Sequence, residues 1–329
     1  ACTFCDFSAP ICKVPVADGG GDPHYKMYFD QLVTVQALCD LNLMSSDVYG
    51  GVEVHSRHSL PLLKKEEEKG YSIISNLALR IGGDTGAVWE LIADGPKLFL
   101  DGIEFDSFKD DEGTTSQNFS TTSPNHGNAM NHYAIQKRVK GQRRNIIEYI
   151  FTFADHSKVV FRGNRHFKMT FIAVHGFSRQ SVEGFLGRTD KRGFFDREGN
   201  NMTSNTYLRR TKNSKFSIEK FAQEWQVGID EPNLFMNKSE YPIAPQQCSF
   251  LAKGSIEGLV DSDHVDTGNH SNMMDVSRRR LSEMDEAAVV MAMEACGHLS
   301  DDNPKKKFCI DDVIATNEAE VALDSFYEE

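Results

Sequence analysis

The sequence has no apolar run near the roughly 18 to 20 residues that a helix needs to cross a bilayer. The best candidates are Tyr149 to Phe153 and Ala287 to Met293, so we predict no membrane span. The chain also lacks an excess of basic residues, with 36 Lys and Arg against 48 Asp and Glu. Because binding to nucleic acid depends on clustered cations that neutralise phosphates, this balance argues against nucleic acid as a partner.

Motifs of common catalytic sites are missing as well. The sequence contains no Gly-x-Ser-x-Gly, no glycine-rich phosphate loop and no His-Glu-x-x-His, the patterns that place a nucleophile, a phosphate or a zinc ion. Cys2 and Cys5 have the spacing of half a zinc site, but no second Cys or His pair lies at a suitable distance. We therefore predict that the protein is not an enzyme, with a hydrolase inside a β-rich body as a remaining alternative.

Cysteines and glycosylation sequons are the features that indicate a compartment. The chain has seven cysteines, of which Cys2, Cys5 and Cys12 lie close together. Asn-x-Ser/Thr sequons, which accept N-linked glycans, occur at Asn118, Asn201, Asn237 and Asn269. Together they favour an extracellular, oxidising location. Because seven is odd, one thiol is free or pairs outside this chain, and because Ala1 is not an initiator Met we expect a longer precursor.

Short apolar, β-branched and aromatic runs separated by polar turns dominate residues 25–235. Such runs predict β-strands, and their period of two indicates half-buried sheets. Without helical periods between them, the strands favour an all-β fold, an antiparallel sandwich or barrel. The stretch from Asp106 to Asn131 has almost no apolar residues, so we predict a long exposed loop there.

The pattern changes after Phe235. We divide the chain into an N-terminal cysteine-containing segment (1–18), a main domain (19–235), a linker (236–275) and a small α-helical C-terminal appendage (276–329). Ser282 to Asp285 resembles a capping box that begins a helix. A disulfide between Cys296 and Cys309, one of the pairings open to these cysteines, would join the two helices of the appendage.

Several motifs occur in an order that indicates a family. They are Gly21-Asp-Pro-His-Tyr25, Phe29-Asp30, Cys39, Phe151 to Ser157, Gly184-Phe-Leu-Gly187, Phe221 to Val227 and Leu234-Phe235. This series resembles the von Willebrand factor type D domain over residues 19–235, and the appendage is similar to the cysteine-containing helical region that often follows it. The family's turn usually contains a cysteine that Gly184 to Arg188 lacks, which removes a familiar partner for Cys39. The chain therefore resembles a cysteine-poor variant, and polymerisation through disulfides does not carry over.

The resemblance also implies a calcium ion. Residues 190–201 are rich in hard oxygen ligands, as Ca²⁺ requires. An EF-hand is excluded because its twelfth position would be Tyr207. In type D domains a loop at this place shares calcium with an acidic residue near the N-terminal motif, which implies Asp30, Asp196, Asn200 and Asn201 as ligands. The alternative is a solvated acidic turn that is glycosylated at Asn201.

The Asp22-Pro23 bond raises the question of self-cleavage. The Asp22 carboxylate can attack its own carbonyl carbon while the proline nitrogen leaves, and some family members with this motif cleave themselves in mild acid. The resemblance implies the same reaction here, with His24 as a local proton donor. We prefer the alternative, in which Asp22 and His24 order a tight turn.

The sequence thus predicts a secreted structural or adhesive glycoprotein module that is stabilised by calcium. Its expected partners are other extracellular proteins, including copies of itself in a filament or matrix. A binding module of a secreted carrier or receptor, with a lipid or protein ligand, is the alternative, because type D domains also occur as accessory parts of secreted carriers.

Overall fold

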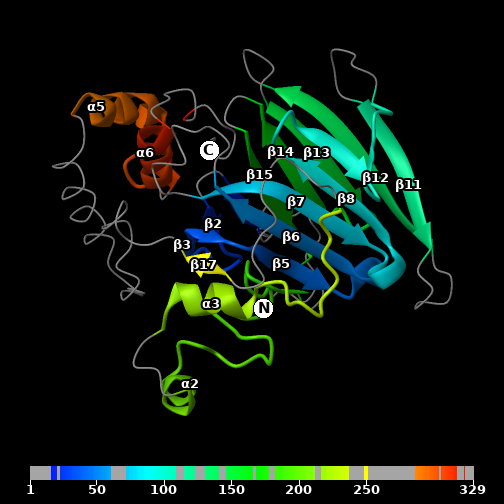
Figure 1. Cartoon of the computed structure of the whole chain (residues 1–329), viewed down its shortest axis with the longest axis horizontal. Coiled ribbons are helices and arrows are strands. Elements are labelled where there is room, and N and C mark those ends of the chain that lie inside the picture. The colour runs from blue at the N-terminus through cyan, green and yellow to red at the C-terminus, as the bar shows by residue number, and fades with distance from the viewer. Residues whose placement is uncertain are drawn as a thin grey trace.

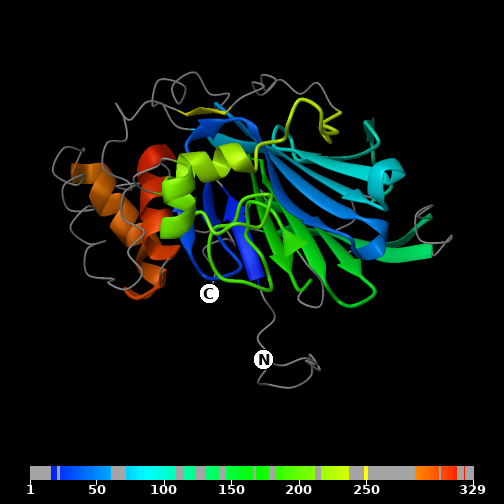
Figure 2. The same cartoon turned by 90° about the horizontal axis from the view of Figure 1, so that it is seen from below.

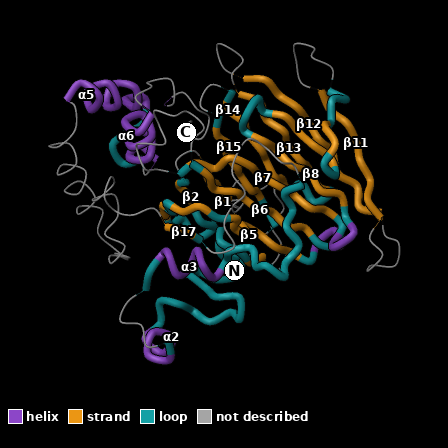
Figure 3. The backbone as a smooth tube through the Cα atoms, in the orientation of Figure 1, coloured by secondary structure: helices purple, strands orange, loops and turns teal. Residues whose placement is uncertain are grey.

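Antiparallel strands make up most of the described protein. A computed structural model of the chain describes residues 16–20, 23–60, 72–108, 115–122, 130–140, 146–165, 168–177, 182–211, 216–236, 248–250, 286–303, 305–316 and 322. Strands fill the centre of the molecule and helices lie at its margin (Figure 3). The expectation of a β-rich antiparallel body followed by helices is confirmed.

The larger sheet has eight strands, in the order β11-β12-β13-β14-β15-β1-β2-β3. Their bounds, in chain order, are β1 Val16–Gly20, β2 His24–Lys26, β3 Leu32–Thr34, β11 Thr115–Thr122, β12 Met130–Lys140, β13 Ile146–Phe153, β14 Lys158–Asn164 and β15 Met169–His175. Strand β1 pairs with β15. The start of the described chain therefore belongs to the same sheet as the hairpins of its middle.

The second sheet has seven strands, in the order β10-β9-β8-β7-β6-β5-β16. Their bounds are β5 Asp40–Ser46, β6 Val52–Ser59, β7 Ile73–Ile81, β8 Ala87–Ile92, β9 Lys97–Leu100, β10 Ile103–Glu104 and β16 Val182–Glu183. A separate pair joins β4 Ala37–Leu38 to β17 Ser249–Phe250. The two large sheets lie face to face (Figures 1 and 2).

Aromatic side chains fill the space between the sheets. Along β13, Tyr149, Phe151 and Phe153 join the main core, whereas Ile150 packs in a small cluster on the outer face, as a period of two requires. Trp89 of β8 is fully buried, and its indole N–H donates to the Tyr133 hydroxyl of β12 at 3.0 Å. This bond satisfies a buried donor and connects the two sheets.

The helices lie outside the sandwich. Their bounds are η1 Val48–Gly50, η2 Gly83–Thr85, α2 Asn205–Arg210, α3 Ile218–Glu224, α5 Glu286–Ala295, η4 Cys296–His298 and α6 Lys305–Thr316. None of the helices in the described ranges is long and apolar enough to cross a membrane.

The C-terminal helices α5 and α6 pack against one end of the sandwich (Figures 1 and 2). The disulfide Cys296–Cys309 joins η4, which follows α5, to α6, with 6.0 Å between the Cα atoms, and these are the cysteines that we pair from the sequence. Buried residues of α6, including Phe308 and Val313, share a cluster with Phe171 of β15. The appendage therefore contributes to a common core with the β body. The proposed capping box at Ser282 to Asp285 lies outside the described residues.

Strands also form in two segments that the sequence predicts as a loop and as a linker. The predicted loop at residues 106–131 contains strand β11, which pairs with β12 along all of Thr115–Thr122. A polar sequence forms a strand here because the long β12 offers a partner and because Phe119 packs against Trp89 at 5.1 Å between ring centroids. The predicted linker at 236–275 includes β17, which the pairing with β4 ties to the body.

Candidate functional site

Two segments far apart in the sequence meet at one end of the sandwich. The backbone N–H of Tyr28 donates to the Leu186 carbonyl at 3.0 Å, and the ring of Phe29 meets that of Phe194 edge-on at 5.3 Å. Gly187 has φ 92°, and a Cβ there would lie 2.9 Å from the Phe29 ring, so only glycine suits this approach. The turn at 184–187 and the loop after it thus contact the turn at 27–30.

Asp196 is the buried acid of the acid-rich loop, residues 188–201. The residue is 6% exposed, and its Oδ1 accepts hydrogen bonds from the Asn200 backbone N–H at 2.7 Å and from Asn200 Nδ2 at 3.0 Å. Its Oδ2 accepts from the same Nδ2 at 2.9 Å. Glu198 Oε2 also accepts from Asn200 Nδ2, at 3.2 Å. Two carboxylates therefore converge on one amide group.

Two other predicted ligands make different contacts. Asn201 Oδ1 accepts hydrogen bonds from the backbone N–H of Thr203 at 2.9 Å and from its hydroxyl at 2.7 Å. Asp30 has a left-handed φ of 64°, and its side chain, 74% exposed, pairs with Lys26 at 3.4 Å. The structure brings Asp196 and Asn200 together, whereas Asn201 orders its own turn and Asp30 points its charge at Lys26.

Arg197 anchors the loop to the closing segment of the main domain, residues 224–231. Its guanidinium pairs with Glu231 and donates to the backbone carbonyls of Glu224 and Gln226, at 2.7 Å each. The indole N–H of Trp225 donates to the Phe195 carbonyl at 3.0 Å. These bonds hold the backbone on both sides of Asp196, at Phe195 and Arg197, and so fix the position of its carboxylate.

The donor set suits a hard cation. Within the described ranges, the Asp196 carboxylate accepts hydrogen bonds from Asn200 and pairs with no Lys or Arg, and an uncompensated buried carboxylate is costly. Asp196, Glu198 and Asn200 would hold Ca²⁺, since rotation of the Asn200 amide exchanges its nitrogen for an oxygen. No three His, Cys, Asp or Glu among the described residues are placed to hold a metal. The other ligands would therefore be amide or carbonyl oxygens and water.

His24 and Pro23 lie in the first hairpin of the larger sheet. The Pro23 carbonyl accepts a hydrogen bond from the Val35 N–H at 3.0 Å. His24 is fully buried, and its Nδ1 bonds to the Thr34 hydroxyl at 2.8 Å. Asp22, the proposed nucleophile of self-cleavage, lies outside the described residues.

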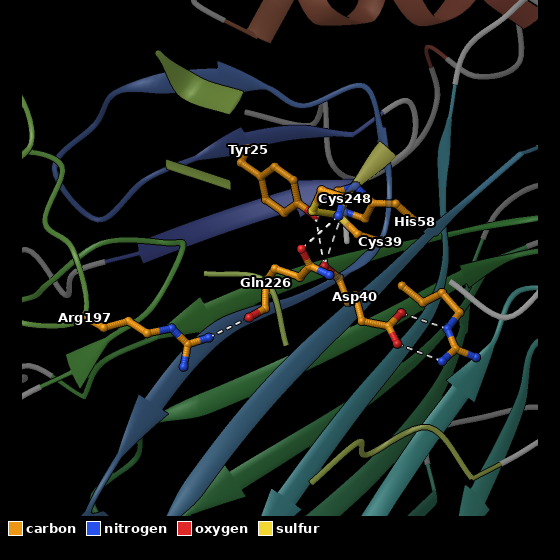
Figure 4. Close-up of a disulfide and its surroundings, with 9 residues drawn as sticks. Tyr25, Cys39, Asp40, His58, Arg197, Gln226 and Cys248 are labelled. Carbon is orange, nitrogen blue, oxygen red and sulfur yellow. Dashed lines mark hydrogen bonds and ion pairs between the residues drawn. A yellow bond between two sulfur atoms is a disulfide. The ribbon is translucent and has the colours of Figure 1, made fainter. Parts of the chain in front are cut away.

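A buried polar cluster lies beside a second disulfide, Cys39–Cys248 (Figure 4). The Tyr25 hydroxyl of the larger sheet is 2.6 Å from His58 Nε2 and 3.2 Å from Ser56 Oγ, both in the facing sheet. Burial lowers the pKa of His58 to about 3 and raises that of Tyr25. Tyr25 therefore donates to a neutral imidazole, and the bond connects the two sheets.

We did not predict the Cys39–Cys248 pair from the sequence, because the turn at 184–188 lacks the cysteine that usually pairs with Cys39 in the family that the chain resembles. Cys39 and Cys248 are separated by 209 residues, with Cα atoms 4.8 Å apart. Gln226 Oε1 accepts the Cys248 N–H at 2.8 Å, which places Cys248 beside the closing segment (Figure 4). Only the cysteine count carried a signal of this pairing, because nothing local predicts which cysteine folds back over Cys39.

The sequons fall in different surroundings. Asn118 is exposed on β11, whereas the Asn201 side chain is engaged with Thr203 of its own sequon. Asn237 and Asn269 lie outside the described residues.

Fold and site together define a disulfide-bonded antiparallel β-sandwich with an acid-rich loop fixed at one end and a helical appendage at another. Known protein families yield no match to the chain, and no curated protein matches it significantly.

Proposed function

We propose that the chain is a secreted structural or adhesive module, stabilised by calcium and built on a fold of the von Willebrand factor type D kind. The observation that carries the proposal is the contact between Phe29 and Phe194, which holds the acid-rich loop against the turn after the Gly-Asp-Pro-His motif. The disulfides Cys39–Cys248 and Cys296–Cys309 support an oxidising compartment.

Calcium acts here as a structural ion. It would neutralise the carboxylates of Asp196 and Glu198 within the loop that Arg197 and Trp225 anchor. An ion that binds only the folded state stabilises it in proportion to the logarithm of its concentration over the dissociation constant. The module therefore unfolds at a higher temperature when calcium is present.

Thermal unfolding with calcium and with excess chelator tests this proposal. At calcium about 100-fold above its dissociation constant we expect a melting temperature about 5 °C higher. Asp196→Asn should abolish the difference. Asp190→Asn is the matched control, since Asp190 lies in the same loop but pairs with Arg188, and it should keep the difference. Identical melting curves with and without chelator would remove calcium from the proposal.

Partners of the module are other extracellular proteins, among them copies of itself. Of the seven cysteines, Cys39, Cys248, Cys296 and Cys309 are paired within the chain. Cys2, Cys5 and Cys12 are the others, and three thiols cannot all pair among themselves. At least one of them is available for a partner.

A further inference from the structure

The two large sheets end in four strands of very different length. Strands β3, β10 and β16 end one sheet or the other and span only Leu32–Thr34, Ile103–Glu104 and Val182–Glu183. Very short edge strands are a common means of preventing unwanted pairing. The fourth edge, β11, spans Thr115–Thr122, so it presents much the longest row of outward backbone N–H and C=O groups.

Strand β11 lacks the charges, prolines and bulges that often protect an exposed edge. Its sequence, Thr-Ser-Gln-Asn-Phe-Ser-Thr-Thr, contains no charge and no proline, and its ladder with β12 runs without a bulge. Charges, prolines and bulges are the features that keep edges apart. No described element lies beyond β11 at this end of the sheet (Figures 1 and 2).

The two faces of β11 are also distinct. Phe119 turns inward and contacts Trp89 and Tyr133, which fixes the strand in the sandwich. Ser116, Asn118 and Ser120 are exposed on the opposite face. A partner strand could therefore continue the sheet without displacing any core side chain.

We propose that β11 pairs antiparallel with β11 of a second copy, and that a glycan on Asn118 prevents this pairing. A two-fold axis normal to the sheet makes such a contact self-complementary and closed. Residues that lie opposite each other in antiparallel strands have their side chains on the same face of the sheet. The two registers that pair the most residues of β11 therefore place the two-fold axis beside Asn118 or beside Phe119. Control of this pairing by the glycan rests on the proposed extracellular function, because only the secretory route adds the glycan.

The position of Asn118 is what makes the glycan decisive. Side chains opposite each other across antiparallel strands have Cβ atoms about 5 Å apart. With the axis beside Asn118 or its neighbour, the glycans of two copies would occupy the same space. The glycosylated edge therefore stays single, and the unmodified edge pairs. A net charge of −12 on each copy opposes association at low salt, but charges are screened beyond about 8 Å at physiological ionic strength.

Molar mass measured by light scattering, in physiological salt, tests the pairing. Cys2, Cys5 and Cys12 are replaced by Ser throughout, so that no disulfide among them contributes. Ser120→Ala removes the sequon but keeps Asn118, and we expect the molar mass to double. Asn118→Lys also prevents glycosylation but places like charges near the axis, and we expect a monomer. Asn237→Gln removes a different sequon as a control. This variant keeps the glycan on Asn118 of β11, so we again expect a monomer.

A monomeric Ser120→Ala chain would overturn the proposal. So would equal dimerisation of Ser120→Ala and Asn118→Lys, because the contact would then not involve β11. A dimer of the fully glycosylated chain would contradict the role of the glycan. None of these results changes the calcium-dependent melting temperature, so failure of the pairing is distinguishable from failure of the proposed function.

Discussion

The imidazole of His24 lies flat on the ring of Phe308, with centroids 4.1 Å apart and planes 7° from parallel. Nearby, Lys305 Nζ is 3.0 Å from the Asp18 carboxylate. The first hairpin of the larger sheet is thus covered by helix α6, although nearly the whole chain separates them. Both contacts join the appendage to the segment that carries the most specific motif of the sequence.

Phe308→Ala should destabilise the protein by about 3 kcal/mol, since a buried aromatic ring is lost and a cavity remains. Unfolding in denaturant measures the change. Met293→Ala, at an exposed site on α5, is the control and should change stability by less than about 0.5 kcal/mol. Equal effects of the two substitutions would mean that the appendage does not depend on its contact with His24.

The surroundings of His24 also bear on self-cleavage. Its ring is enclosed by Thr34 and Phe308, which fits a residue that orders the hairpin. We expect the Asp22-Pro23 bond to stay intact when the protein is incubated at pH 5. Intact-mass analysis decides, and a fragment that begins at Pro23 would show that the chain cleaves itself.

His58 makes stability depend on pH. Its pKa in the folded protein is about 3, below the value of about 6.5 that we take for the unfolded chain. As the pH falls, His58 is therefore protonated in the unfolded state before it is protonated in the folded state. The free energy of unfolding decreases as the pH drops from about 6.5 towards 3. Between pH 7 and pH 5 this group should cost about 2 kcal/mol.

His58→Gln should remove that pH dependence while it keeps a hydrogen-bonding group near Tyr25. Denaturant unfolding at pH 7 and pH 5 gives the two free energies. His132→Gln, at an exposed position of β12, should behave as the wild type. An unchanged pH profile for His58→Gln would show that the buried imidazole is not responsible.

Some of this architecture could be predicted from the sequence and some could not. Alternation of apolar residues, as in Tyr149, Phe151 and Phe153, predicts strands because each packs into a core that requires a period of two. Strand β11 has only one apolar residue, Phe119, and it depends on pairing with β12, a tertiary effect that no local pattern reveals. The loop around Asp196 could be recognised from its carboxylates, whereas the ion pair of Asp30 with Lys26 arises from a turn that periodicity does not specify.

The two disulfides should differ in their contribution to stability. Replacing Cys39 and Cys248 together by Ala frees a loop closed over 209 residues, and closing a long loop removes more entropy from the unfolded chain than closing a short one. We expect a loss above about 4 kcal/mol. The matched pair, Cys296→Ala with Cys309→Ala, opens a separation of 13 residues and should cost about 3 kcal/mol. The opposite order in denaturant unfolding would contradict this explanation.

Electrophoresis without reductant shows how copies are linked by the three N-terminal cysteines. If two of Cys2, Cys5 and Cys12 pair with each other, one thiol remains, and a single intermolecular bond closes at a dimer. If all three cysteines bond to other copies, each chain is linked to more than one neighbour. Oligomers of increasing size then form and appear as a ladder of bands. We expect covalent species that disappear on reduction and in the triple Ser variant, while the Cys296→Ala and Cys309→Ala variant keeps them. A chain that migrates as a monomer and titrates one reactive thiol would rule out covalent self-assembly.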